Sequence, residues 1–509
     1  MIEDNEISCR ELGPMNRTFV INRAGHTEIW QSVNLAALLS FILSLYFLII
    51  QYINIGSSND RQLSILLSCG HILATISYAW LTYRFVKKSP ILLLTPAAGY
   101  ILCCSVFFGF GGLATIMADD LTLALMARDA YIIDYASQIR ADVAIFSGST
   151  LLLLAMNVGR LPRPTEARLV ARPSLRKLAT TAVLVGLLLK FSVLLPEAWG
   201  YIQWTVPGSL KSLSQLPDVG FLLMAIAIAR GDRGLLGVFV ALWLPHLAIC
   251  LLEFSKTAVI FAMAMPAIGA LIGGSTFIRV LPLILLAALL FAFSQNVNVT
   301  ARNSILAFNG IENHAPISLR VEALSEAVNS AIYKDEEVQA YNQAPPQLWW
   351  VRLNYSGPLI RAMQLHDLGQ PGRWNVPILQ FLVPRIFWPD KPVLDNAGQT
   401  FNRIVTQNEK ISGRVSITVF GEGYWIAGWP GLALFATLSG LILGLVMRQS
   451  LAWLDQRDYL YFPVALLAFN IGAVGILDFF QTSLLGATAM LIGLSIVTGL
   501  VARYVIRLF

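Results

Sequence analysis

The chain has 509 residues, of which 56% are hydrophobic and only 13% are charged, and its mean hydropathy is +0.65. Because soluble globular domains carry about 25% charged residues, this composition excludes an ordinary soluble protein. The net charge of +6 reflects a surplus of lysine and arginine in loops of the kind retained in the cytoplasm, so we expect no nucleic-acid partner. One membrane span takes roughly 20 apolar residues, and the chain is therefore long enough for a dozen helical spans.

Apolar runs follow one another along most of the chain. Residues 1–28 are polar and lack the apolar leader and small-residue cleavage site of a signal peptide, so we expect the first apolar run to be retained as a span. Twelve runs are long enough to predict membrane helices. They cover residues 30–53, 63–86, 91–117, 141–159, 178–195, 216–229, 235–252, 258–274, 280–293, 425–447, 460–480 and 484–506. The pattern predicts an all-α polytopic membrane protein with about 12 transmembrane helices.

The distribution of basic residues predicts the orientation of these spans. Nineteen lysines and arginines fall on the side of the N-terminus and five fall in the short loops opposite, which places both termini in the cytoplasm. The chain then divides into a cytoplasmic segment 1–29, nine spans over 30–296, a large external loop 297–414 and three spans over 415–509. We expect short amphipathic helices in the loop, because residues 318–333 repeat apolar side chains at helical spacing.

The second half of the external loop is the more basic part. After about residue 345 it holds eight basic and four acidic residues. Arginine presents a planar fork of donors that matches phosphate oxygens, so several converging arginines suit a diphosphate. The alternative interpretation is a solvated loop surface. The cations that we expect to bind a diphosphate are Arg352, Arg361, Arg385, Lys391 and Arg414, with Lys256 at the outer end of the seventh span.

Two sequence elements frame the end of this loop. Residues 383–392 read VPRIFWPDKP, in which three prolines stiffen a turn that presents Arg385 and Lys391. Residues 421–431 read GEGYWIAGWPG and lead into the tenth span. These elements resemble those of the Wzy-type oligosaccharide repeat-unit (O-antigen or exopolysaccharide) polymerases, in which a P-R-hydrophobic-P-x-K-P element precedes a G-E-x-Y-x-x-x-G-x-x-G element. The resemblance covers about residues 380–431 and the plan of many spans with one late external loop.

The resemblance implies a GT-C-like or Wzy-like membrane enzyme in the bacterial inner membrane. Such an enzyme joins undecaprenyl-diphosphate-linked oligosaccharides, which serve as both donor and acceptor, at the periplasmic face, and a chain-length regulator protein can accompany it. The resemblance also places Arg385 and Lys391 at the diphosphate and brings Glu422 and Tyr424 into the second element.

Glycosyl transfer requires deprotonation of the acceptor hydroxyl and stabilisation of the departing diphosphate. Glu422, Tyr424 and His366 are the candidate catalytic residues, with Glu422 or His366 as the base. His71 and His246 lie within spans, where a packing role is more common. No Cys or His pair has the spacing of metal ligands, so we expect neither metal nor cofactor.

Other charged residues allow competing interpretations. Glu253 and Lys256 could line a polar cavity or simply lie at the membrane boundary, and Lys190 could contact a lipid phosphate or extend towards the interface. Two other functions also remain open. An O-antigen ligase would share the lipid diphosphate, and a polytopic transporter of lipid-linked or soluble saccharide would share the number of spans, although carriers usually have their long linker in the middle and inside the cell.

Overall fold

The computed structural model describes residues 23–54, 60–117, 134–160, 174–202, 206, 212–309, 315–333, 353–373, 388, 397–407, 414–455 and 459–504. Across these ranges the regular structure is helical and no strand occurs, which confirms the predicted all-α class.

Nine helical segments of the described chain are long and apolar enough to cross a membrane, as a multi-pass protein requires. They are Thr27–Ile53, Arg61–Lys88, Pro96–Leu113, Tyr135–Arg160, Leu175–Ala198, Arg233–Leu252, Phe277–Ser294, Thr418–Leu454 and Phe480–Val501. Shorter apolar helices at Leu213–Ala229, Thr257–Gly273 and Tyr459–Gly475 coincide with the sixth, eighth and eleventh predicted runs.

One group of helices comprises α1 (Arg23–Asn54), α2 (Asp60–Lys88), α3 (Pro96–Cys103), α6 (Tyr135–Met156) and α19 (Thr418–Asp455). Helix α6 packs between α1 and α19. Gly440 of α19 approaches the backbone of α6 so closely that an added Cβ would lie 2.2 Å from the carbonyl oxygen of Leu152. Small residues of this kind let membrane helices approach closely. Helices α2 and α6 are joined by a buried hydrogen bond of 3.1 Å between His71 and Asp142.

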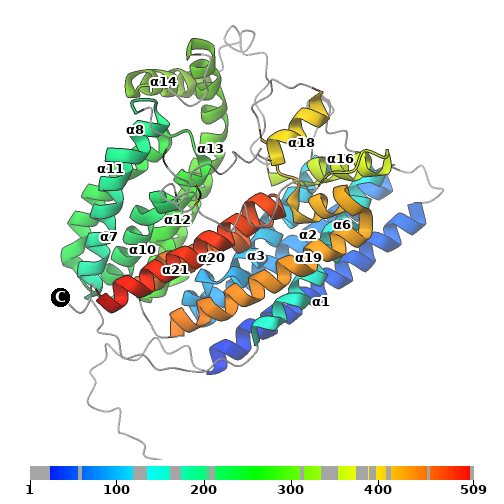
Figure 1. Ribbon diagram of the computed structural model, residues 1–509, viewed down its shortest axis with the longest axis horizontal. Coiled ribbons are helices and arrows are strands. Elements are labelled where there is room, and N and C mark those ends of the chain that lie inside the picture. The colour runs from blue at the N-terminus through cyan, green and yellow to red at the C-terminus, as the bar shows by residue number, and fades with distance from the viewer. Residues whose placement is uncertain are drawn as a thin grey trace, which may run out of the picture.

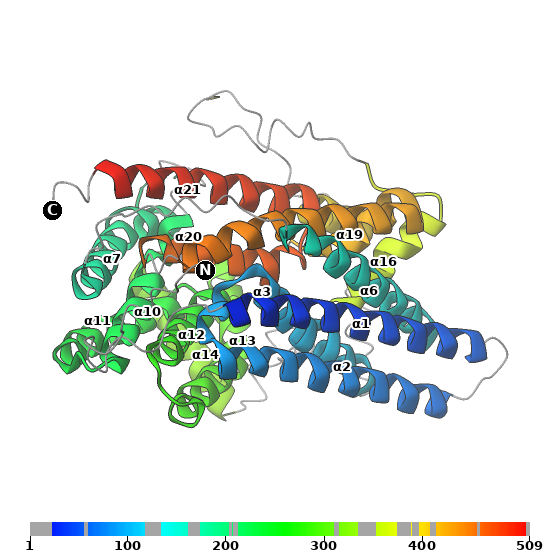
Figure 2. The same cartoon turned by 90° about the horizontal axis from the view of Figure 1, so that it is seen from below.

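The second group comprises α7 (Leu175–Leu189), α10 (Leu216–Ala229), α11 (Leu236–Leu252), α12 (Lys256–Gly273) and α13 (Phe277–Asn309). Helix α10 packs against α7 and α12. Figure 2 shows α20 (Phe462–Asn470) between the two groups, where it contacts both α3 and α10. Helix α21 (Gly486–Tyr504) runs beside α20.

The described part of the predicted external loop forms three helices between α13 and α19: α14 (Ile317–Tyr333), α16 (Ser356–Asp367) and α18 (Ala397–Thr406). Helix α14 confirms the amphipathic helix expected at 318–333, since Ala323 and Ala327 are buried against α13. Helix α13 continues to Asn309, beyond the predicted end of its apolar run, and α16 packs on α6 and α19.

Candidate functional site

The second sequence element forms a kink in α19. Ala427 and Gly428 leave the helical conformation, and Gly428 has φ +64° and ψ −149°, a region that only glycine adopts readily. Pro430 follows the kink and has no backbone N–H to donate to the turn before it. Gly423 and Gly431 are packed against each other's backbone, since a Cβ on Gly431 would lie 2.1 Å from the carbonyl oxygen of Gly423. The glycines of the element thus permit a sharp bend between the first turns of α19 and its longer remainder.

The bend supplies an acceptor for the segment that follows α16. In a regular helix the carbonyl oxygen of Trp425 would accept from the N–H of residue 429. Here it accepts from the backbone N–H of Gly372 at 3.0 Å and lies 3.0 Å from Nδ1 of His366. The indole N–H of Trp425 also donates to the carbonyl oxygen of Gln370 at 3.0 Å. The end of α16 is therefore fixed to the kink.

These contacts determine which nitrogen of His366 can act as a base. A carbonyl oxygen only accepts, so the Nδ1 that faces it must carry a proton. The neutral ring is then protonated at Nδ1, and Nε2 keeps its lone pair. A Cβ at Gly428 would lie 3.0 Å from this Nε2. The backbone of the kink thus fixes both the tautomer and the position of the ring.

His366 belongs to a group that we call the Tyr424 cluster: Arg140, His366, Asp367 and Tyr424. The hydroxyl of Tyr424 donates to Asp367 at 3.2 Å. Arg140, in the second turn of α6, donates to Asp367 at 2.5 Å and also to the Tyr424 hydroxyl. The Arg140 guanidinium lies 5.5 Å from the centre of the Tyr424 ring, and the His366 ring lies edge-on to the same ring at 5.4 Å.

The Tyr424 cluster is open to solvent on the side of Arg140 and Asp367, whereas Tyr424 itself is buried. The side chains of Arg140 and Asp367 are 35% and 37% exposed, and the cluster lies where α6, α16 and the first part of α19 meet. It combines a histidine base with a carboxylate and a guanidinium, which are groups that bind hydroxyls and anions. Such a site can deprotonate a bound hydroxyl.

Glu422 occupies a different position from the other predicted catalytic residues. It lies two residues before Tyr424, is only 3% exposed, and accepts a short hydrogen bond from the backbone N–H of Phe480. Phe480 begins the π-helical segment η12 (Phe480–Leu485), so the carboxylate binds an N–H at a helix start. We interpret Glu422 as a positioning residue that fixes the start of η12 and α21 to α19.

Among the predicted diphosphate-binding cations, Arg361 and Arg414 are described. Arg361 lies on α16, where it donates to Gln364 at 3.4 Å and its buried Nε has no hydrogen-bond partner. Arg414 is exposed just before α19. The remaining predicted cations, Arg352, Arg385, Lys391 and the side chain of Lys256, lie outside the described part of the chain.

The structure thus brings together the two candidates His366 and Tyr424 and adds Arg140 and Asp367. Asp367 carries a weak sequence signal because it follows His366 directly. Arg140 also carries a weak sequence signal, because it is a charged residue directly before an apolar run. Charged residues in or beside membrane spans often mark function. The sequence does not indicate that the two residues pair.

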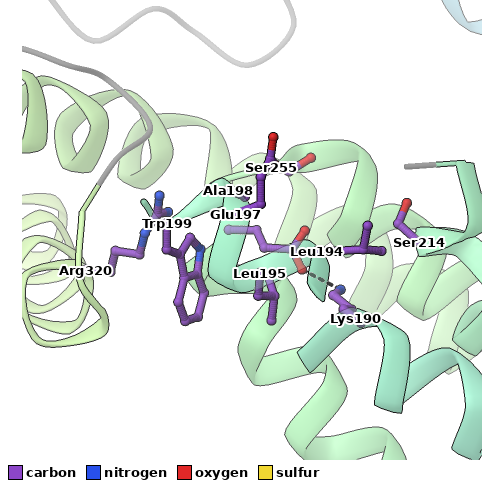
Figure 3. A pocket seen from close by; sticks show the side chains of 10 residues that line it. Lys190, Leu194, Leu195, Glu197, Ala198, Trp199, Ser214, Ser255 and Arg320 are labelled. Atoms are coloured by element: carbon purple, nitrogen blue, oxygen red, sulfur yellow. Dashed lines mark ion pairs between the residues drawn. The ribbon is translucent and has the colours of Figure 1, made fainter. Parts of the chain in front are cut away.

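A polar pocket of about 370 Å³ lies at the end of the second helix group, beside the ends of α7 and α11, the start of α12 and Arg320 of α14 (Figure 3). Lys190, only 4% exposed, forms an ion pair with Glu253 and donates to the sulfur of Cys250 at 3.4 Å. Arg320 of α14 donates to the carbonyl oxygen of Leu252 at 3.0 Å, and its guanidinium lies 5.2 Å from the centre of the Trp199 ring.

Lys190 begins the π-helical segment η6 (Lys190–Leu194), and its buried side chain lines the polar pocket. Glu253, which the sequence associated with Lys256, forms an ion pair with Lys190. Burial lowers the pKa of Arg320 to about 10, which leaves the guanidinium charged at neutral pH.

Among the described residues, no group of three His, Cys, Asp or Glu side chains is arranged to hold a metal ion. A scan against protein families and searches of curated proteins and of solved structures found no match to this chain.

Proposed function

We propose that this chain is a metal-independent glycosyltransferase that polymerises lipid-diphosphate-linked oligosaccharide repeat units, with the Tyr424 cluster at its active centre. The observation that carries the proposal is the hydrogen bond from His366 to the carbonyl oxygen of Trp425. It leaves Nε2 as a base beside Tyr424, within the sequence element that resembles the Wzy-type polymerases.

The reaction needs few groups from the protein. Nε2 of His366 accepts the proton of the acceptor hydroxyl, and the resulting oxygen attacks the anomeric carbon of the donor. The bond from that carbon to the diphosphate breaks, and the diphosphate leaves with the electron pair. Asp367 accepts a hydrogen bond from a sugar hydroxyl, while Arg140 holds Asp367 and Tyr424 in place.

The departing diphosphate requires positive charge near the Tyr424 cluster. Arg361 lies on α16 and Arg414 lies just before α19, and the element at 383–392 contributes Arg385 and Lys391. We propose that these cations, together with Arg352, bind the diphosphate. Lys256, on the second helix group, then serves another part of the substrate.

The remaining features follow from the same proposal. All twelve apolar segments cross the membrane, both termini are cytoplasmic, and the arrangement is GT-C-like. The membrane is the bacterial inner membrane, the lipid is undecaprenyl diphosphate, and a chain-length regulator is a potential partner.

Membrane vesicles that contain the protein test this function directly when they are supplied with a lipid-diphosphate-linked repeat unit. A ladder of lengthening products is expected from the wild type. His366→Ala should abolish the ladder, whereas Leu368→Ala should preserve it, because Leu368 is next to the Tyr424 cluster but is 69% exposed.

Other products would contradict the proposal. Transfer that depends on an added lipid A core would indicate an O-antigen ligase. Movement of unchanged substrate across the membrane would indicate a transporter. A full ladder from His366→Ala would exclude His366 as the base.

A further inference from the structure

The polar pocket adjoins two apolar cavities, which we call the apolar track. A cavity of about 120 Å³ shares Ser214 with the pocket and is otherwise lined mainly by apolar side chains of α10, α20 and α21. A further cavity of about 180 Å³ shares Leu216, Val219 and Pro463 with it and continues along α7. The three spaces thus lie in a row, with charged residues lining one end and apolar residues the other.

The row of cavities is long enough for part of a lipid chain. It follows α7 from Lys190 to Leu178, which is roughly 18 Å at 1.5 Å per residue, more than half of a hydrocarbon core of about 30 Å. It passes between α7 and α10 on one side and α20 on the other. A track bounded by helices on both sides suits a single chain better than a two-chain phospholipid.

The polar end carries charges of both signs. Lys190 and Arg320 can donate to phosphate oxygens, while Glu197 and Glu253 can accept from hydroxyls. A bare phosphate would be repelled by the two carboxylates. A phosphate that carries a sugar offers hydrogen-bond partners to all four charged side chains. The ring of Trp199, which also lines the pocket, adds an aromatic surface.

Lys190 is the first of a row of buried polar side chains that contact one another. Cys250 lies between Lys190 and His246, and the His246 Nε2 lies 2.9 Å from Asp218. These side chains are nearly inaccessible, and Nδ1 of His246 has no hydrogen-bond partner. Ionisable residues within membrane helices are costly to bury and usually serve function.

We infer that the second helix group holds a single-chain lipid bearing a glycosyl phosphate or diphosphate, with its head at Lys190 and its chain between α7, α10 and α20. The inference deepens the proposed function, because a polymerase acts on two lipid-linked molecules and this track gives one of them a place apart from the Tyr424 cluster. Recognition here depends on both the phosphate and the sugar.

The experiment measures binding to the purified full chain in nanodiscs. The probes are farnesyl diphosphates that carry glucose, galactose or N-acetylglucosamine, with unglycosylated farnesyl diphosphate and phosphatidylglycerol as comparisons. At least one glycosylated probe should bind about tenfold more tightly than both comparisons, which corresponds to about 1.4 kcal/mol.

Two kinds of variant separate the head from the chain. Lys190→Met and the size-conserving Glu197→Gln should each weaken binding of the glycosylated probe about tenfold. Ala182→Trp fills the apolar track and should weaken binding of every farnesyl probe. Leu188→Trp is its matched control, since Leu188 is on the same helix but is 69% exposed and does not line the track.

Equal binding of the glycosylated and unglycosylated probes, or equal effects of Ala182→Trp and Leu188→Trp, would overturn the inference. If Lys190→Met fails to fold, Glu197→Gln and Ala182→Trp still decide it. Binding is also measured on His366→Ala protein, in which turnover is absent. Normal polymerisation with no probe preference would refute this inference alone, whereas clear probe preference with no polymerisation in the wild type would refute the proposed function alone.

Discussion

Replacement of Gly428 by alanine tests whether the kink in α19 positions the Tyr424 cluster. A side chain at φ +64° and ψ −149° costs about 1–3 kcal/mol in backbone strain. Its Cβ would also lie 3.0 Å from Nε2 of His366, which is closer than ordinary contact. If the helix straightened to relieve this strain, the carbonyl oxygen of Trp425 would exchange its two donors, from His366 and Gly372, for one helical N–H. At about 1 kcal/mol for a hydrogen bond, that exchange also favours the kink.

Both responses displace the base, so Gly428→Ala should lower the thermal midpoint and reduce chain extension by at least tenfold. The assays are thermal unfolding in detergent and the product ladder in vesicles. Gly493→Ala is the matched control, because Gly493 lies within α21 and a Cβ there meets nothing within 4 Å. This control should change stability by no more than about 1 kcal/mol. Equal stability and activity of the two variants would refute the role assigned to the kink.

The remaining predictions concern the base, the cations and the topology. His366→Gln should be as inactive as His366→Ala, with a loss of about 10²–10⁴ in rate measured from the ladder, because the amide can donate to the Trp425 carbonyl but cannot accept a proton at neutral pH. Arg140→Lys should recover only part of the activity lost in Arg140→Ala, since an ammonium does not reproduce the fork that reaches both Asp367 and Tyr424; full recovery would contradict the geometry. Arg385→Ala should abolish extension with normal expression and Arg385→Lys should restore part of it, whereas full activity of the alanine variant would remove Arg385 from the mechanism. Cysteines introduced at 373 and 403 should react with an impermeant label from outside, and labelling from the cytosol would overturn the topology.

The helices could be predicted from the sequence because a membrane span is a local property. Each apolar run must satisfy its own backbone hydrogen bonds, so its composition alone indicates a helix. Boundaries were less predictable where helices continue into protein contacts. The tenth apolar run begins at residue 425, whereas α19 begins at Thr418, because Val419 and Phe420 are buried although they precede the kink. Helix α13 likewise extends to Asn309 through packing against α14.

The candidate site was predictable only in part because its pairs are distant in sequence. Arg140 and Asp367 are 227 residues apart, and no spacing rule connects them. The ion pair of Lys190 and Glu253 could not be predicted either, because more than 60 residues separate the two. Each residue alone is compatible with a side chain that extends towards the interface. The role of His366 depended on its tautomer, which is set by a carbonyl that the kink frees.

The second sequence element therefore contributes placement more than chemistry. Glu422 binds the start of η12, and Tyr424 holds Asp367. Gly428 leaves room for His366, and the freed carbonyl of Trp425 orients its ring. The proposed base, His366, comes from α16, which is a separate helix. Because the element binds this helix to the membrane core, a change in the element can remove activity without touching the substrate, and restoring the position of α16 should restore the reaction.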